Sequence, residues 1–442
     1  MRKISRRDFL KSLGGLTAVS KKNQSQGSSK RDGKTPVIRQ EKEVPVICTA
    51  CDGGCGVLVT VRGDEVVDFE GDPDHPVNQG FLCEQGESFF SLSASRSWTP
   101  HLFYKPAGGA AWEIKDWGPI VRTVAQRVKN TRDAAIKQDS GAARSIGCLW
   151  DDSLLTNEEG YLLFKFFQAL GVPVLNKGRY PGALSFRNWV NIADRYPLVN
   201  PKGKTRYLVA LMETWYGENM LPGTSSITLQ PEDRLTEWLT SGNAKGLFIW
   251  GGGLLPQEPE NAMISILQSV EWLVMIDWFK TREDFAASSE KIAETCPKTE
   301  VFLLPAAAPW EKSGSLISAG RWVQWCARVV EPSGQVKTPL WMIDRLFKLV
   351  RDLYQGDGVS PEPILKIKWD YSGNAVPDAE LVAAEIERCF QESAQVFNEQ
   401  AETSAESSMT CGLQLHSGYW GGKALSMRRS LDHGRWGFPL PQ

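Results

Sequence analysis

The sequence predicts an α/β protein in which a small β-rich domain is followed by a region of parallel strands and helices. Short runs of β-branched residues on either side of a Gly63-Asp64 turn predict a hairpin early in the chain. Further along, buried-strand runs alternate with apolar residues at helical spacing, the order typical of a parallel sheet covered by helices. With 442 residues, 42% of them hydrophobic, the chain can form two or three domains with real cores.

Charge and hydropathy exclude two classes of function. The net charge is −2 and the pI is near 6.2, so the chain lacks the basic surface that nucleic-acid binding needs. No apolar run approaches the length of a membrane-spanning helix. We therefore expect no nucleic-acid partner, and membrane contact only through partner proteins.

Residues 1–42 are expected to form a signal and a linker. Ser5-Arg6-Arg7-Asp8-Phe9-Leu10-Lys11 has the twin-arginine pattern of bacterial export signals, which predicts a periplasmic protein. The apolar stretch that follows is short, and no small-x-small cleavage site is visible. A basic disordered arm is the alternative, and a non-functional signal would leave the protein in the cytoplasm. Residues 20–40 are too polar to fold alone.

The first domain is expected at 43–140. Residues 57–61 and 66–69 form the predicted hairpin, whose loops would carry several cysteines. From Trp117 to about Ile136, apolar residues recur at helical spacing, and this helix is expected to close the domain.

The second domain is expected at 141–393 and an irregular tail at 394–442. The predicted strands are 145–150, 172–175, 246–250, 272–277 and 300–305, and the predicted helices are 157–170, about 260–269 and 341–354. Strand, helix and strand follow one another in the manner of a Rossmann-like layer.

Four cysteines carry the most specific chemistry of the chain. Cys48, Cys51 and Cys55 are separated by two and three residues, and Cys83 follows at a distance. Three thiolates from one compact loop and a fourth from a returning segment suit a [4Fe–4S] cluster. The small residues between them leave room for sulfide. A structural zinc site and two disulfides are the alternatives, although zinc usually binds two close pairs of cysteines.

The remaining cysteines are scattered. Cys148, Cys326, Cys389 and Cys411 are expected to be small core residues, whereas Cys296, beside a proline in a loop, is expected to be accessible.

A glycine turn forms a second candidate site. Gly251, Gly252 and Gly253 follow a predicted strand, and Asp277 ends the next one. A strand, a glycine turn and a helix can present N–H groups to a phosphate, and the acid can bind a ribose or a base. The same pattern is also common in turns that bind nothing.

Several motifs together resemble the molybdopterin (bis-guanine-dinucleotide) oxidoreductases, and among them the formate dehydrogenase alpha subunits. They are the cysteine loop, the run Gly71-Asp72-Pro73-Asp74-His75-Pro76, Asn157-Glu158-Glu159, Glu311-Lys312-Ser313-Gly314, Gly320-Arg321-Trp322 and Thr410-Cys411-Gly412. The resemblance implies a small [4Fe–4S] domain before a reduced α/β region of the molybdopterin oxidoreductase type. It also implies that Gly251–Gly253, Asp277 and Arg321 lie along a pterin dinucleotide site for Mo/W-bis-MGD.

The chain departs from this family where catalysis would occur. The segment that carries a selenocysteine or cysteine ligand followed by histidine is absent, and no histidine of the chain follows a cysteine. Gln85 stands where the family has a lysine between cluster and pterin. Only residues 195–240 replace a long middle section, and the capping domain beyond Gln442 is expected to be missing.

These observations are consistent with three alternative functions. The first is a formate dehydrogenase-like subunit that keeps its cluster, relays electrons or scaffolds a complex, and docks to an iron–sulfur (beta-type) subunit. The second is an active or split formate dehydrogenase that uses Mo/W-bis-MGD. The third is a non-redox structural remnant.

Overall fold

The computed structural model describes the chain from residue 41 to residue 386 with gaps. The described residues are 41–51, 53–75, 77–94, 101–109, 111–138, 145–150, 154–172, 174–176, 206–217, 244–251, 264, 267–278, 289–292, 294–317, 323–371 and 376–386. The predicted signal, the linker before residue 41 and the tail at 394–442 lie outside them.

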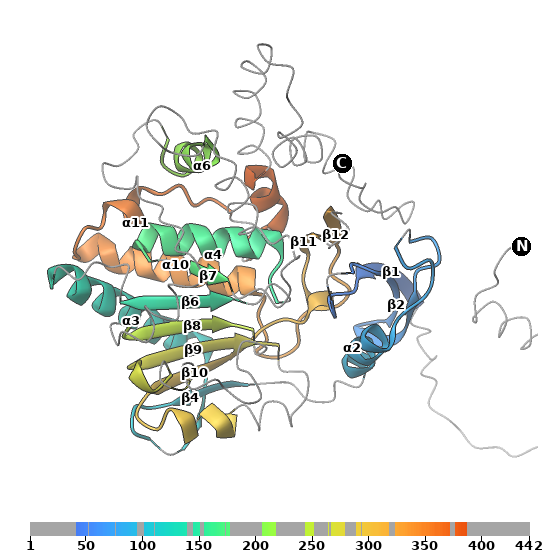
Figure 1. Cartoon of the computed structure of the whole chain (residues 1–442), viewed down its shortest axis with the longest axis horizontal. Helices are drawn as coiled ribbons and strands as arrows, with labels where there is room; N and C mark the ends of the chain where they lie inside the picture. Colours follow the sequence, from blue (N-terminus) through green and yellow to red (C-terminus); the bar gives the residue numbers. More distant parts are fainter. Residues whose placement is uncertain are drawn as a thin grey trace, which may run out of the picture.

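A three-stranded antiparallel sheet forms the N-terminal part (Figure 1). Its strands are β1 (Glu41–Ile47), β2 (Gly56–Arg62) and β3 (Glu65–Gly71), in that spatial order. The predicted hairpin is confirmed as β2 and β3, while β1 adds a strand that the sequence analysis did not predict. Helix α2 (Glu84–Ala94) packs next to β3. The loops that flank this hairpin carry the cysteines: Cys48, Cys51 and Cys55 lie before β2, and Cys83 lies after β3.

A seven-stranded sheet forms the centre of the larger part. Its order is β5-β4-β10-β9-β8-β6-β7. The strands are β4 (Leu102–Lys105), β5 (Glu113–Lys115), β6 (Ile146–Trp150), β7 (Val174–Asn176), β8 (Gly246–Trp250), β9 (Trp272–Asp277) and β10 (Glu300–Pro305). The five strands from β10 to β7 run parallel, while β4 and β5 are antiparallel additions at one edge. The predicted mixed α/β class is therefore confirmed.

The parallel strands are apolar along their whole length because both faces of the sheet are covered. Every residue of β8 and β10 is buried, and β9 is buried up to Ile276. Phe248, Val274 and Ile276 belong to the main core, and Leu247, Leu273 and Met275 to a second core on the other face. An uninterrupted apolar run therefore marks a central strand here.

The helices include α3 (Trp117–Lys137), α4 (Asn157–Leu170), α6 (Arg206–Tyr216), α10 (Pro339–Gly356) and α11 (Glu362–Lys366). The predictions for α3, α4 and α10 are confirmed. Helix α4 starts with a Thr156/Glu159 capping box and ends at Gly171, whose φ of 72° suits glycine. Among the described helices, none is long and apolar enough to cross a membrane.

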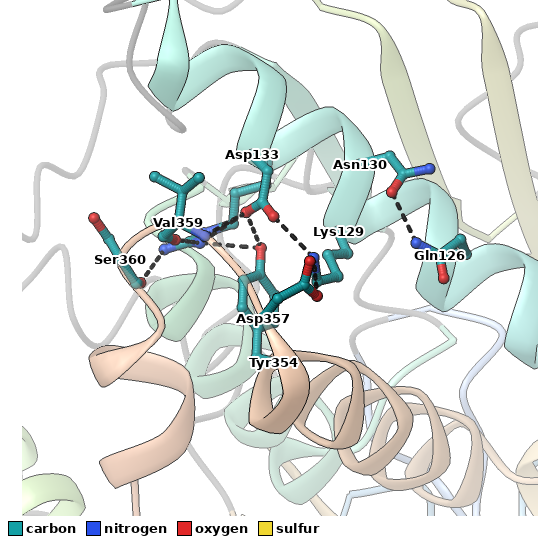
Figure 2. A network of polar contacts seen from close by, with 9 residues as sticks. Gln126, Lys129, Asn130, Asp133, Tyr354, Asp357, Val359 and Ser360 are labelled. Atoms are coloured by element: carbon teal, nitrogen blue, oxygen red, sulfur yellow. Dashed lines mark hydrogen bonds and ion pairs between the residues drawn. The ribbon is translucent and has the colours of Figure 1, made fainter.

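Helix α3 does not close the small domain, as the sequence analysis expected, but packs against α10 and the seven-stranded sheet. A polar network joins the two helices (Figure 2). Asp133 accepts hydrogen bonds from the Tyr354 hydroxyl at 2.7 Å and from Lys129 at 3.1 Å. Arg132 donates to the Val359 carbonyl at 2.7 Å. The division of the chain at residue 140 stays a prediction, and the large sheet takes strands from both sides of it.

A hairpin of β11 (Gly314–Ile317) and β12 (Val323–Cys326) lies between the two sheets (Figure 1). The sequence analysis did not predict it. Strand β12 lies beside β1. An aromatic cluster adds a second connection, because Phe89 of α2 packs on Trp278 and Trp310 with ring centroids 5.2 and 5.5 Å away. Trp278 directly follows β9, so the small sheet lies against the carboxyl edge of the large one.

The structure shows whether three of the cysteines outside the cluster motif are buried. Cys148 and Cys326 are core residues, as predicted. Cys296 is only 1% exposed, so the expectation that it is accessible is wrong. It packs with Leu267, Val270 and Ile292 behind the large sheet, and burial raises the pKa of its thiol to about 11.

Candidate metal centre

The loop that joins β1 to β2 carries three of the four cysteines. Ile47 pairs with Gly56 as the last step of the ladder, and the Cys48 N–H then donates to the Cys55 carbonyl at 2.8 Å. Cys48 and Cys55 therefore face each other across the base of the loop, with Cys51 towards its tip. A compact loop of this kind can direct three thiols to one side.

Helix α2 brings in the fourth cysteine. Cys83 directly precedes the helix, and its carbonyl accepts from the Glu87 N–H at 2.9 Å. A Cβ on Gly86, in the first turn, would lie 3.5 Å from the Cys48 sulfur and 2.7 Å from Leu82. The glycine is required by the Leu82 side chain, while the Cys48 sulfur lies at ordinary contact distance. The first turn of α2 therefore lies against the loop.

The segment between β3 and Cys83 is held to the start of β2 by Asn78. Its side-chain oxygen accepts from the Gly56 N–H at 2.9 Å, and its amide donates to the carbonyls of Gly56 at 2.9 Å and Phe81 at 2.8 Å. A Cβ on Gly56 would lie 2.5 Å from the His75 ring. The Gly-Asp-Pro run therefore places Cys83 by backbone contacts and close packing.

Gln324 of β12 connects this segment to the cysteine loop. Its side-chain oxygen lies 2.8 Å from the His75 Nε2, and its amide donates to the Gly54 carbonyl at 3.0 Å. His75 and Gln324 are both fully buried. Both loops that carry cysteines are thus tied to one side chain of the β11–β12 hairpin. No sequence pattern predicts a role for Gln324, because a glutamine in a tryptophan-rich segment carries no signal of its own.

The four thiols influence one another electrostatically. Burial, together with the charges of Cys55, Cys51 and Cys83, raises the pKa of Cys48 to about 12, although an N–H of Ala50 opposes this. Burial, Cys51 and Cys83 likewise raise the pKa of Cys55. Iron binds thiolates, so binding to these cysteines would release protons.

The cysteine loop offers hydrogen-bond donors and little side-chain bulk next to its sulfur atoms. The Gly53 N–H donates to the Cys51 sulfur at 3.4 Å, and a Cβ on Gly53 would lie within 3.4 Å of Cys51 and 3.7 Å of Cys55. The Thr49 hydroxyl is buried, with no hydrogen-bond partner among the described residues. The described cysteines are all free thiols, which does not support the disulfide alternative. In the described part of the chain, no three His, Cys, Asp or Glu side chains form a group that could hold a metal ion.

The second predicted site is described in part. Gly251 is buried with φ 106°, and its N–H donates to the Ile276 carbonyl at 2.8 Å. This brings Gly251 next to Asp277 at the carboxyl edge of the parallel strands, where ligands of open α/β sheets bind. The indole N–H of Trp250, 2% exposed, has no hydrogen-bond partner within the described ranges. Gly252, Gly253 and Arg321 lie outside the described residues, and Gln85 is exposed on α2.

Two motifs of the resemblance contact each other although they are far apart in sequence. The carboxylate of Glu158, in the first turn of α4, accepts from the Ser315 hydroxyl at 2.6 Å and from its N–H at 2.7 Å. Lys312 forms a buried ion pair with Glu159 at 2.5 Å. Burial raises the pKa of Glu158 to about 7, against the lowering effect of the Ser315 hydrogen bonds. These motifs join α4 to the β11–β12 hairpin.

Comparison with known proteins identifies the class of the N-terminal domain. Residues 41–94, which contain the four cysteines, match the family described as the molybdopterin oxidoreductase Fe4S4 domain. This is a domain that holds a [4Fe–4S] cluster, and it coincides with the three-stranded sheet and α2.

Similar proteins are found among formate dehydrogenases and nitrate reductases. Formate dehydrogenase 2 subunit alpha (cytochrome c-553) of Nitratidesulfovibrio vulgaris is 34% identical over 184 residues, 38% of this chain and 18% of the relative. Formate dehydrogenase subunit alpha of Megalodesulfovibrio gigas is 27% identical over 181 residues, with the same shares. Periplasmic nitrate reductase of Desulfovibrio desulfuricans is 29% identical over 157 residues, 35% of this chain and 20% of the relative.

These matches confirm the resemblance to the molybdopterin oxidoreductase family, and within it to formate dehydrogenase alpha subunits. The similarity to formate dehydrogenase alpha subunits extends over about two fifths of this chain. The matched part spans about a fifth of the length of these curated relatives.

Proposed function

We propose that Cys48, Cys51, Cys55 and Cys83 hold a [4Fe–4S] cluster and that the chain relays electrons within a formate dehydrogenase-like complex. The observation that carries this proposal is the match of residues 41–94, which contain all four cysteines, to the molybdopterin oxidoreductase Fe4S4 domain family. When bound, the cluster supplies one-electron transfer. The protein supplies four thiolates, N–H donors to sulfur and a buried base of the loop.

Two features of the sequence favour an electron-relay role over catalysis. Gln85 is a neutral side chain at the position where the resemblance implies a lysine that links cluster and pterin. No Cys-His ligand segment occurs in the sequence. Electrons that enter the cluster would therefore leave to another protein and not to a metal on this chain.

The proposed partner is an iron–sulfur (beta-type) subunit, and the charge of the cluster domain indicates how it docks. Residues 41–94 contain eleven Asp or Glu and two Lys or Arg, a net charge of −9, while the whole chain has −2. Glu84 and Glu87, next to Cys83, are exposed, and Phe81 is 70% exposed. Exposed acidic residues close in sequence to an exposed apolar residue suit a partner with a basic face. The twin-arginine pattern supports a periplasmic location for this complex.

Metal analysis of anaerobically purified protein tests the proposal. We expect four irons per chain and no molybdenum or tungsten. Stoichiometric molybdenum or tungsten would overturn the relay role in favour of an active enzyme. A protein that contains no metal would support the structural remnant instead.

The ligand assignment is tested by Cys83→Ser. We expect loss of the broad visible absorbance of the cluster while the large sheet stays folded, because Cys83 lies outside that sheet. Cys148→Ala is the matched control, since Cys148 is a core residue of β6. Unchanged absorbance in Cys83→Ser would show that another residue binds the iron.

A second candidate is an active or split formate dehydrogenase that binds Mo/W-bis-MGD. Gly251 lies next to Asp277, and the Trp250 indole at the end of β8 has no hydrogen-bond partner among the residues that the structure describes. Both features support a bound nucleotide at this sheet edge. In this sequence no cysteine is followed by a histidine that could serve at the metal, so a second polypeptide would have to complete the site. Formate-dependent dye reduction by the purified chain, together with bound molybdenum or tungsten, would favour this candidate.

A further inference from the structure

The hydroxyl of Thr49 lies in the cysteine loop without a partner. Thr49 follows Cys48 directly and precedes Cys51 by two positions. Its Oγ1 is buried, and among the described residues it makes no hydrogen bond. Leaving a buried hydroxyl unpaired is unfavourable, so native proteins normally give such a group an acceptor. We therefore expect the acceptor to belong to the group that the loop binds.

Other donors of the loop already point to sulfur. The Gly53 N–H donates to the Cys51 sulfur at 3.4 Å. An N–H of Ala50 hydrogen-bonds the Cys48 thiol. Thr49 directly precedes Ala50 in the sequence. A threonine hydroxyl can rotate to donate wherever an acceptor lies.

We propose that Thr49 donates an O–H···S hydrogen bond to a sulfur atom of the [4Fe–4S] cluster and thereby raises its reduction potential. The inference rests on the proposed function, because it needs the cluster in this loop. A donor to a cluster sulfur stabilises the more negative, reduced state, and hydrogen bonds of this kind are one of the factors that set cluster potentials. Thr49 acts on the reduction potential of the cluster through this direct hydrogen bond.

The test compares Thr49→Val with Thr49→Ser in the full chain, purified anaerobically. Valine has nearly the shape of threonine but no donor, while serine keeps the hydroxyl. We expect Thr49→Val to shift the midpoint potential to a lower value and Thr49→Ser to stay near the wild type. Thr60→Val, a buried threonine of β2, is the matched control and should leave the potential unchanged.

A spectroscopic measurement identifies the bond itself. The reduced cluster is examined by electron–nuclear double resonance in H2O and D2O. We expect one exchangeable proton coupling that is lost in Thr49→Val and kept in Thr49→Ser. If Thr49→Val does not assemble four irons, Thr49→Ala, which cannot overpack the loop, provides the same comparison.

The outcomes separate this inference from the proposed function. A loaded Thr49→Val or Thr49→Ala protein with the wild-type potential and all exchangeable couplings would overturn the role of Thr49 and leave the cluster assignment intact. Wild-type protein without iron would overturn the proposed function, and the role of Thr49 with it.

Discussion

Single buried side chains hold the parts of this protein together, and Glu158 is the most sensitive of them to pH. It is fully buried, and its carboxylate accepts hydrogen bonds from the hydroxyl and the N–H of Ser315. Its pKa in the folded protein, about 7, lies above the ordinary value of 4.5. The proton is therefore bound more tightly in the folded state than in the unfolded state.

The sign of the pH effect follows from this shift. The stability that Glu158 contributes is fully present below about pH 4.5 and is lost as the pH rises through about 7. We predict that Glu158→Gln, which cannot ionise, gains up to about 3 kcal/mol relative to the wild type between about pH 5 and about pH 8. Urea unfolding followed by tryptophan fluorescence measures this difference.

The matched control is Glu362→Gln on the exposed surface of α11. Its free energy of unfolding should differ from the wild type by a similar small amount at both pH values. A Glu158→Gln difference that does not change with pH would contradict the prediction.

At the scale of elements, the β11–β12 hairpin decides whether the cysteine loops stay in place. Gln324 is the one described side chain that hydrogen-bonds both His75 and the cysteine loop at Gly54. Strand β1 and helix α2 would keep their own hydrogen bonds without it. The two loops would lose one of the connections between them and would keep the hydrogen bonds of Asn78 to Gly56.

We predict that Gln324→Ala releases iron to a chelator up to about 30-fold faster than the wild type, since two buried hydrogen bonds are lost and each contributes about 1 kcal/mol. The absorbance decay of the anaerobic protein in excess chelator measures the rate. Gln126→Ala, an exposed glutamine of α3, serves as control and should release iron at the wild-type rate. Equal rates for both variants would mean that the hairpin does not support the loops.

The packing of α3 on α10 depends on the polar network of Figure 2. We predict that Asp133→Ala lowers the free energy of unfolding by about 3 kcal/mol, because Lys129 and the Tyr354 hydroxyl lose a buried acceptor. Asn130→Ala, which removes only an exposed hydrogen bond from Gln126, should cost less than about 0.5 kcal/mol. Equal losses in the two variants would contradict a structural role for the network.

At the scale of the whole molecule, charge is unevenly distributed. The cluster domain at residues 41–94 carries −9, so the remainder of the chain carries +7, the difference between −2 and −9. A partner that docks on the cluster domain therefore meets a strongly acidic surface, whatever the near-neutral total charge. Attraction between exposed charges is screened by salt over about 10 Å at 0.1 M.

We predict that association with the iron–sulfur partner weakens as salt rises from about 0.05 M to about 0.3 M, mainly through a slower association rate. The double variant Glu84→Gln and Glu87→Gln should flatten this dependence. Glu362→Gln should not alter it. Surface plasmon resonance at several salt concentrations measures the rates, and a salt-independent rate would contradict electrostatic docking.

Local features of the sequence determined the elements and the choice of cluster chemistry. The apolar runs of β8, β9 and β10 predicted buried strands because a strand covered on both faces needs no polar alternation. The helical spacing of α3, α4 and α10 was equally local. Cysteine spacing predicted the iron–sulfur domain for the same reason, since three of its four thiols come from one short loop.

Contacts between distant residues were decided only by the tertiary structure. The hairpin of β11 and β12, the link from Gln324 to His75, and the pairing of Glu158 with Ser315 join segments far apart in the sequence, and no local pattern encodes such a partner. For the same reason the burial of Cys296 was missed: its neighbours in sequence predict a loop, but the large sheet covers it. The sequence therefore identified the four cysteines and the class of protein, whereas folding decided what supports them, because support comes from packing and hydrogen bonds across the chain.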